Sequence, residues 1–134
     1  MLLTRESDYA LRVLRSLQDG ERRSVGDICL QQLIPQQFAY KLIKKLSRAG
    51  LVEITRGVDG GCRLTGDLEK TFLYDLMTIM EDSCGLNACM DPDYRCPWQE
   101  QNGTCRIHQQ LAHLQQQLDG ELRALSLKTL LGGA

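Results

Sequence analysis

Residues 34–65 read IPQQFAYKLIKKLSRAGLVEITRGVDGGCRLT, and their pattern changes from helical to alternating halfway along. Pro35 suits the first position of a helix, where a missing N–H costs nothing, and Gly50 suits its C-terminal end. One side of this helix is apolar and is predicted to be buried; it carries Phe38, Leu42, Leu46 and Ala49. The other side is polar and basic, and it carries Gln37, Tyr40, Lys41, Lys44, Lys45 and Arg48.

The residues after Gly50 predict a β-hairpin. Residues 51–56 alternate between apolar and polar, and a second short run follows at residues 62–65. The glycine-rich segment 57–61 between them suits a hairpin tip, because glycine tolerates the positive φ that such tips demand. A basic helix followed by a hairpin is the order of a winged helix-turn-helix. A generic three-helix domain followed by a hairpin would also fit the periodicity.

Two helices are predicted before residue 34. Thr4 can cap the first helix and Gly20 can end it, and Ser24 can cap the second. Apolar residues recur in both with helical spacing: Ala10, Val13, Leu14, Leu17, Val25, Ile28 and Cys29. A fourth helix, at residues 72–81, packs Leu73, Leu76, Met77 and Met80. The prediction is a mainly α fold with a small β-hairpin wing, whose winged helix-turn-helix domain spans residues 1–82.

The remaining chain divides into a loop and a final helix. Residues 83–104 contain Asn, Gly, two Pro and several cysteines without any period, so they are predicted to form a structureless cysteine-rich loop. Residues 105–134 are predicted to form a long helix and a tail. The helix carries a stripe of Leu111, Leu114, Leu118, Leu122 and Leu125. Because little core is left to cover, this stripe is expected to pair with a second copy of the chain. Packing back onto the first helix is the alternative.

Charge divides the chain in the same way. Residues 1–63 hold 11 Lys and Arg against 7 Asp and Glu, a net of +4, whereas residues 64–134 hold 5 against 10, a net of −5. The positive half would attract a polyanion such as DNA, although a solvated helix face would also be rich in lysine. No apolar run is long enough to span a membrane, and the charged start at residues 1–8 does not resemble a secretion signal. A cytoplasmic protein is therefore expected.

Four of the six cysteines lie within 22 residues, with the spacing Cys84-x4-Cys89-x6-Cys96-x8-Cys105-x2-His108. In a reducing compartment, clustered thiols are more often metal ligands or redox switches than disulfides. Three readings remain open: a Cys3His zinc site, an oxidisable Cys84–Cys89 pair, and a cysteine enzyme built on Cys105 and His108. Cys29 and Cys62 lie outside the cluster and are expected to be packing residues.

Several segments resemble the IscR, NsrR, RirA and CymR group of bacterial winged-helix regulators. These segments are residues 8–12 (DYALR), Ile34-Pro35 with Phe38, Lys41 and Leu42, residues 46–52 (LSRAGLV), Arg56-Gly57, Gly60-Gly61, and residues 127–131 (LKTLL). Where many relatives have an aromatic residue after the paired glycines, this chain has Cys62. The resemblance extends over nearly the whole chain and implies a homodimeric DNA-binding transcription regulator, a repressor.

In that group the recognition helix enters the major groove and a wing arginine reaches the minor groove. The resemblance therefore implies base contacts by Gln37, Tyr40 and Lys41, and a minor-groove contact by Arg56. Plain helix surface is the alternative for Gln37 and Tyr40. Phosphate contacts are expected from Lys44, Lys45 and Arg48, and Gln36 completes the predicted DNA-binding set. A dimer would present two such helices to double-stranded DNA, so a palindromic operator is expected.

The resemblance also implies an iron–sulfur cluster, either [2Fe–2S] or [4Fe–4S]. Its expected ligands are Cys89, Cys96 and Cys105, with a fourth ligand that is ambiguous among His108, Asp8 of a second subunit, and Cys84. Three thiolates and one weaker ligand would leave a cluster that can be lost. The expected function is then regulation of DNA affinity by iron, oxygen, nitric oxide or redox state. A cluster-free thiol switch or zinc regulator of the same fold is the alternative, and a cysteine enzyme is a remote one.

Overall fold

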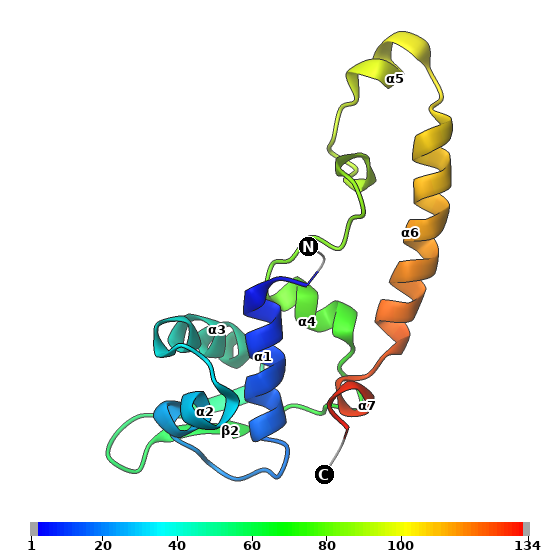
Figure 1. Cartoon of the computed structure of the whole chain (residues 1–134). Coiled ribbons are helices and arrows are strands. Elements are labelled where there is room, and N and C mark those ends of the chain that lie inside the picture. The colour runs from blue at the N-terminus through cyan, green and yellow to red at the C-terminus, as the bar shows by residue number, and fades with distance from the viewer. Residues whose placement is uncertain (1–2, 133–134) are drawn as a thin grey trace.

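The computed structural model describes residues 3–132. The first two residues of the predicted DNA-binding segment and the last two of the predicted C-terminal segment lie outside the described residues. In Figure 1, α1 to α4 and the hairpin gather in one part of the molecule, and the long helix α6 extends away from it. The elements are α1 (Arg5–Ser16), α2 (Val25–Gln32), α3 (Gln36–Arg48), β1 (Val52–Thr55), β2 (Gly61–Leu64), α4 (Leu73–Ile79), η1 (Ala88–Met90), α5 (Pro97–Asn102), α6 (Arg106–Ala124) and α7 (Leu127–Leu131).

The predicted caps of the first two helices are confirmed. The Thr4 hydroxyl accepts a hydrogen bond from the Ser7 N–H, and the Ser24 hydroxyl accepts one from the Asp27 N–H. These bonds satisfy helix N–H groups that have no partner inside the helix. The apolar stripes of α1 and α2 then meet α3 in one core, in which the largest fully buried side chains include Val13, Leu14, Leu17, Ile28, Leu42, Ile43 and Leu46.

Helix α3 differs in detail from the prediction. Pro35 is the N-cap and not the first helical residue. The buried stripe is Ala39, Leu42, Ile43 and Leu46, whereas Phe38 is 42% exposed and Ala49 is exposed. Both stripes have helical spacing, and the packing of α3 against α1 and α2 decides for the one that contains Ala39 and Ile43. Phe38 instead lies at the edge of the core beside Tyr9, with a ring-centroid distance of 6.0 Å.

The wing is a two-stranded antiparallel hairpin in which Val52 pairs with Leu64 and Thr55 pairs with Gly61. The free edge of β2 is joined to the α1–α2 connection, because the Arg23 N–H donates to the Cys62 carbonyl at 3.0 Å and the Cys62 N–H donates to the Arg23 carbonyl at 2.8 Å. A Cβ on Gly61 would lie 2.3 Å from the Arg23 carbonyl oxygen, so only glycine fits there.

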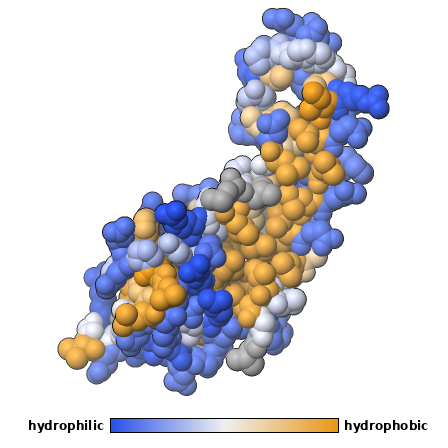
Figure 2. Space-filling view, viewed as in Figure 1, coloured by the Kyte–Doolittle hydropathy of each residue, from blue (hydrophilic) through white to orange (hydrophobic). Residues whose placement is uncertain are grey.

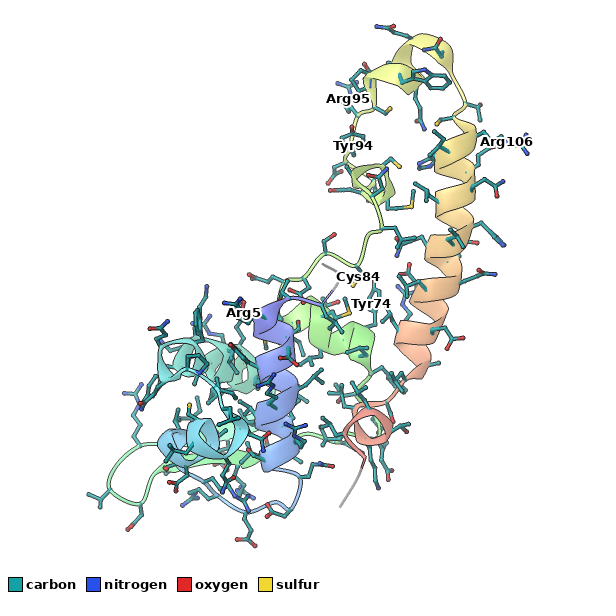
Figure 3. All side chains as sticks on the ribbon, viewed as in Figure 1. Arg5, Tyr74, Cys84, Tyr94, Arg95 and Arg106 are labelled. Atoms are coloured by element: carbon teal, nitrogen blue, oxygen red, sulfur yellow. The ribbon has the colours of Figure 1, made fainter. Side chains whose placement is uncertain are left out.

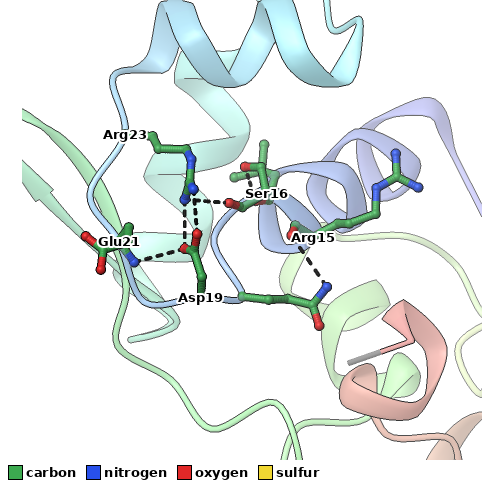
Figure 4. Close-up of polar contacts among 7 residues, drawn as sticks. Arg15, Ser16, Asp19, Glu21 and Arg23 are labelled. Carbon is green, nitrogen blue, oxygen red and sulfur yellow. Dashed lines mark hydrogen bonds and ion pairs between the residues drawn. The ribbon is translucent and has the colours of Figure 1, made fainter. Parts of the chain in front are cut away.

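The Arg23 side chain ties the same connection to the C-terminal end of α1. It donates to the Ser16 carbonyl at 2.8 Å and to both carboxylate oxygens of Asp19 at 2.8 and 2.5 Å (Figure 4). The hydrogen bond from Arg23 lowers the pKa of Asp19 to about 2, with a smaller contribution from the Glu21 N–H. The position of the wing therefore depends on the C-terminal end of α1.

Cys29 and Cys62 are buried, as expected for packing residues, and Cys62 has no exposed surface. Burial disfavours a charged thiolate and raises the pKa of Cys62 to about 11. A free thiol in an unfolded chain has a pKa of about 8.5. Both thiols therefore remain neutral at ordinary pH.

The pKa of Cys62 predicts a loss of stability in alkali. As the pH rises from about 9 to 11, the unfolded chain loses the Cys62 proton and the native chain keeps it, so the free energy of unfolding falls. The expected contribution is about 2 to 3 kcal/mol by pH 11. Denaturant unfolding of the native chain and of Cys62→Ala, at several pH values and one protein concentration, measures it. Cys62→Ala is expected to lose less stability over this range; an identical pH dependence in both proteins would contradict the prediction.

Helix α4 is shorter than predicted at its C-terminal end, but Leu73, Leu76, Met77 and Met80 are buried as expected. The segment after it is not structureless. Asn87 caps the short helix η1, and Cys96 precedes α5, whose first residue is Pro97. The polar and proline signals that predicted a loop therefore start two short helical segments instead.

Helix α6 has no buried residue, and its neighbours within the chain are α4 and η1. The leucine stripe is half-buried, except for Leu114, which is 51% exposed. Figure 2 shows a band of hydrophobic surface that follows α6 and continues onto the other part of the molecule. Helix α7 returns to that part, where Leu127 is fully buried and its N–H donates to the Thr71 carbonyl. None of the described helices is long and apolar enough to cross a membrane.

Candidate nucleic-acid interface and cysteine pocket

A groove of about 690 Å³ separates α3 from the wing. Helix α3 contributes Tyr40, Lys41 and Lys44 to its lining, and the turn after β1 contributes Arg56 and Gly57. The N-terminal end of α2, at residues 24–26, closes one side. The structure thus brings four of the predicted DNA-binding residues to one groove. Helix N-termini and cations both favour a negatively charged ligand.

The predicted DNA-binding residues around this groove are accessible. Gln36, Gln37, Tyr40, Lys41, Lys44, Arg48 and Arg56 are all exposed. The Gln36 amide donates to the Tyr40 hydroxyl at 3.4 Å. Within residues 3–132, Lys41, Lys44, Arg48 and Arg56 make no ion pair. Their charges are therefore available to an external anion.

Lys45 differs from the other basic residues of α3. Its ammonium group lies 3.0 Å from a Glu6 carboxylate oxygen and 3.6 Å from a Glu81 carboxylate oxygen, and its side chain is only 16% exposed. The hydrogen bond to Glu6 is the main cause of a raised Lys45 pKa. Lys45 therefore points to α1 and to the end of α4, and not to the open groove.

A second cavity, of about 500 Å³, brings together Cys89, Cys96, Cys105 and His108. We call it the cysteine pocket. Cys89 lies in η1, whereas Cys96 and Cys105 stand at the N-caps of α5 and α6. His108 follows three residues after Cys105, on the same side of α6. Tyr94 and Trp98 also line the pocket.

The donors in the cysteine pocket suit iron, because soft thiolates and an imidazole nitrogen are usual ligands of iron–sulfur centres. His108 Nδ1 is buried and has no hydrogen-bond partner within residues 3–132. An orphaned buried nitrogen of this kind is costly unless a ligand satisfies it. The four side chains surround the cavity without converging: in the described part of the chain, no three donors are close enough to hold a single metal ion.

The other two candidates for a fourth ligand lie elsewhere. Cys84 lines the adjoining pocket with Tyr74 and Asp119, and Figure 3 shows it beside Tyr74, away from Arg95 and Arg106. Burial, followed by the charges of Asp119 and Asp82, raises the pKa of Cys84. Asp8 lies on α1 and pairs with Arg12 at 2.9 Å.

Sequence reasoning missed the residue that attaches the cysteine-containing segment to α6. The Gln115 amide donates to the Cys84 carbonyl at 2.7 Å, and its oxygen accepts from the Leu86 N–H at 2.7 Å. The same amide nitrogen also donates to the Asp119 carboxylate at 2.8 Å, which fixes its orientation. Gln115 begins a run of three glutamines, so no signal in the sequence separates it from its neighbours.

A family of known proteins and one individual relative match the sequence of this chain. The model of the family Rrf2, iron-dependent transcriptional regulator, matches residues 3–133. Protein aau3 of Rhizobium meliloti (strain 1021) is 34% identical over 100 residues. This match covers 72% of the chain and 65% of aau3, so the chain spans just under two thirds of that relative.

Solved structures share the fold at low sequence identity. CymR, the global cysteine regulator of B. subtilis, is 17% identical with a TM-score of 0.70, and the match covers 98% of this chain and 97% of that one. CymR of Staphylococcus aureus is 20% identical with a TM-score of 0.71, covering 98% of each chain. T. potens IscR is 17% identical with a TM-score of 0.69, covering 98% of this chain and 87% of that one. The predicted mainly α winged-helix fold is confirmed.

Proposed function

The chain belongs to the Rrf2 family of iron-dependent transcriptional regulators, and we propose that it is a DNA-binding repressor whose DNA affinity is set by an iron–sulfur cluster in the cysteine pocket. The observation that carries this proposal is the gathering of Cys89, Cys96, Cys105 and the unpartnered His108 nitrogen around one cavity. When bound, such a cluster supplies a labile, redox-active group that oxygen, nitric oxide or iron scarcity can remove. In this proposal residues 1–82 bind DNA, residues 83–104 hold most of the ligands, and residues 105–134 pair two subunits.

The groove between α3 and the wing supports the DNA-binding half of the proposal. It is lined by Lys41, Lys44 and Arg56, which are exposed, and by the N-terminal end of α2. Lysine can donate to base edges and phosphates, and arginine is drawn to a narrow minor groove. Two copies related by a two-fold axis would read a palindromic site. Binding to bacterial DNA also implies a cytoplasmic protein.

His108 is our choice for the fourth ligand, because it lines the pocket with the three cysteines and its Nδ1 is otherwise unsatisfied. A zinc ion holds its ligands about 2.0 to 2.3 Å from a single centre, which requires a tight group. Ligands spread around a 500 Å³ cavity suit a multi-iron cluster better. The matching family is one of transcriptional regulators, so an enzyme built on Cys105 and His108 is not proposed.

A metal-free thiol switch is the second candidate. The four cysteines after residue 83 are free and partly accessible, so they could be oxidised without unfolding the chain. The family includes members of both kinds. The expected Cys84–Cys89 pair is less favoured, since Cys84 lines a different cavity from Cys89.

The cluster is tested by the visible spectrum and by iron and sulfide analysis of protein purified without oxygen. Wild-type protein is expected to be brown, and the ratio of iron to sulfide to protein gives the cluster type. Cys96→Ser is expected to lose most of the iron because it removes one of three thiolates. Cys84→Ser is the matched control and is expected to keep it. Trp98 is the only tryptophan and lines the pocket, so its fluorescence is expected to be quenched in the loaded wild-type and Cys84→Ser proteins and not in Cys96→Ser.

Two outcomes would contradict the cluster. Colourless wild-type protein that also fails to take up iron and sulfide during reconstitution would favour the thiol switch. Full iron content in Cys96→Ser would remove that residue from the site. Either result leaves the DNA-binding half of the proposal standing.

A further inference from the structure

Helix α4 ends in a way that its sequence does not favour. The Glu81 N–H donates to the Thr78 carbonyl at 3.0 Å, and the Asp82 N–H donates to the Met77 carbonyl at 2.8 Å. This pair of bonds is the Schellman motif, which places the residue after the C-cap in the left-handed region and usually requires glycine. Here that residue is Glu81, with φ of 63°. A strained non-glycine residue is most simply explained when its side chain is needed.

The Glu81 side chain reaches the recognition helix. Its carboxylate lies 3.6 Å from the Lys45 ammonium group, which also contacts Glu6 of α1 at 3.0 Å. A glycine at residue 81 would relieve the backbone but would lose this contact. The contact links the end of α4 to the last turn of α3.

Asp82, the next residue, holds the beginning of α1. Its carboxylate accepts hydrogen bonds from the Thr4 N–H at 3.2 Å, from the Thr4 hydroxyl at 2.7 Å and from the Ser7 hydroxyl. Ser7 is the one buried polar residue among residues 3–132, and Thr4 is the N-cap of α1. Two successive residues therefore fix α3 and α1 relative to α4.

The same two residues stand at the start of the segment that forms the cysteine pocket. Cys84 follows two residues later, and Gln115 binds the backbone of Cys84 and Leu86 to α6. Between that anchor and Cys89 lie only residues 87 and 88. The pocket-forming segment is therefore joined to Glu81 and Asp82 by only a few residues.

We propose that Glu81 and Asp82 are positioning residues that couple the cysteine pocket to the recognition helix, through Lys45 and the N-terminal end of α1. This inference rests on the proposed function, since it names how the state of the pocket reaches DNA. While both contacts hold, Lys45 stays paired and α3 keeps the orientation seen here. When the segment moves, Lys45 loses one partner and the capped end of α1 loses its hydrogen bonds to Asp82, so α3 is held differently. Coupling free energy requires such a difference in contacts between two states.

The test measures DNA affinity of the loaded and the cluster-free protein, and takes the ratio of the two dissociation constants. The probe is a fluorescent duplex selected by the wild-type protein, in both forms, from a random library. Wild-type protein is expected to show a ratio of about 10-fold or more, within the usual range of allosteric coupling. Glu81→Gly and Asp82→Asn are each expected to bring the ratio to within about 3-fold of one. Their iron content and visible spectrum are expected to match those of the wild type.

Three controls separate coupling from damage to the fold. Glu81→Gly suits the left-handed backbone, so lost coupling there is not caused by strain. In Lys45→Met the ratio of the two dissociation constants is also expected to approach one, whereas Lys45→Arg is expected to keep most of the wild-type ratio. Glu21→Gln removes an exposed carboxylate from the α1–α2 connection and is expected to keep the wild-type ratio.

Different results would overturn the proposed function and the coupling. A wild-type ratio of one, or a wild-type protein without a cluster, overturns the proposed function and the coupling with it. A wild-type ratio that persists unchanged in both Glu81→Gly and Asp82→Asn overturns the coupling alone.

Discussion

Alanine at both Lys41 and Arg56 is expected to weaken DNA binding about 100-fold or more without unfolding the chain. A good side-chain contact to a base is worth about 1 to 3 kcal/mol, and these two residues line opposite sides of the same groove. Both side chains are exposed and make no ion pair within residues 3–132, so the core loses nothing when they are removed. Fluorescence anisotropy at fixed salt with a selected duplex measures the affinity, and circular dichroism checks the fold.

The control variant combines Lys70→Ala with Lys128→Ala. It removes two positive charges from the C-terminal half, outside the groove. Net charge alone changes DNA affinity. The DNA affinity of this control is therefore expected to fall much less than that of the groove variant. Equal losses in the two variants would mean that only net charge matters. An unchanged affinity of the groove variant would contradict the assignment of the groove to DNA.

The caps and stripes that could be predicted from the sequence depend on neighbours within one helical turn. Thr4 and Ser24 each satisfy an N–H three residues later, which is a local requirement. The stripe of α1 and the paired glycines of the wing are local in the same sense. Such features are visible in a sequence because the physics that produces them needs no knowledge of the tertiary fold.

The errors concern side chains whose surroundings are set by distant residues. Phe38 is apolar and was expected to be buried, but the stripe of α3 that meets α1 runs through Ala39 and Ile43. Lys45 looks like its neighbours in the sequence, and only the structure shows that it pairs with Glu6 and Glu81. The position of these two carboxylates beside Lys45 does not follow from periodicity.

The candidate ligands illustrate the same limit. Their spacing already suggested a site, because four cysteines and a histidine within 25 residues are unusual in a reducing compartment. Spacing did not distinguish Cys84 from Cys89, since both follow a turn with little secondary structure. The separation arises from Gln115, which fixes the segment so that Cys84 and Cys89 line different cavities.

Leu114→Glu is expected to convert a dimer into monomers while leaving the fold of each chain intact. Helix α6 has no buried residue, and Leu114, at 51% exposed, is the most exposed leucine of its stripe. In a two-fold dimer the substitution occurs twice, and because half of Leu114 is already covered in one chain, each lost leucine costs about half of the 1.5 to 3 kcal/mol of full burial. The dimer dissociation constant is therefore expected to rise by about 10-fold to 100-fold from this term, and further from the cost of burying the carboxylate. Sedimentation equilibrium measures this constant.

Gln116→Glu adds the same charge to an exposed position of α6 and is the matched control. If the leucine stripe pairs two subunits, only Leu114→Glu should dissociate them, and its circular dichroism should match the wild type. Its DNA affinity should fall too, because a monomer binds one half-site and loses the effective concentration that links the second. A dimer that persists in Leu114→Glu would place the pairing surface elsewhere. The apolar band of α6 would then need another partner, since a solvent-exposed leucine stripe of this length is otherwise a liability.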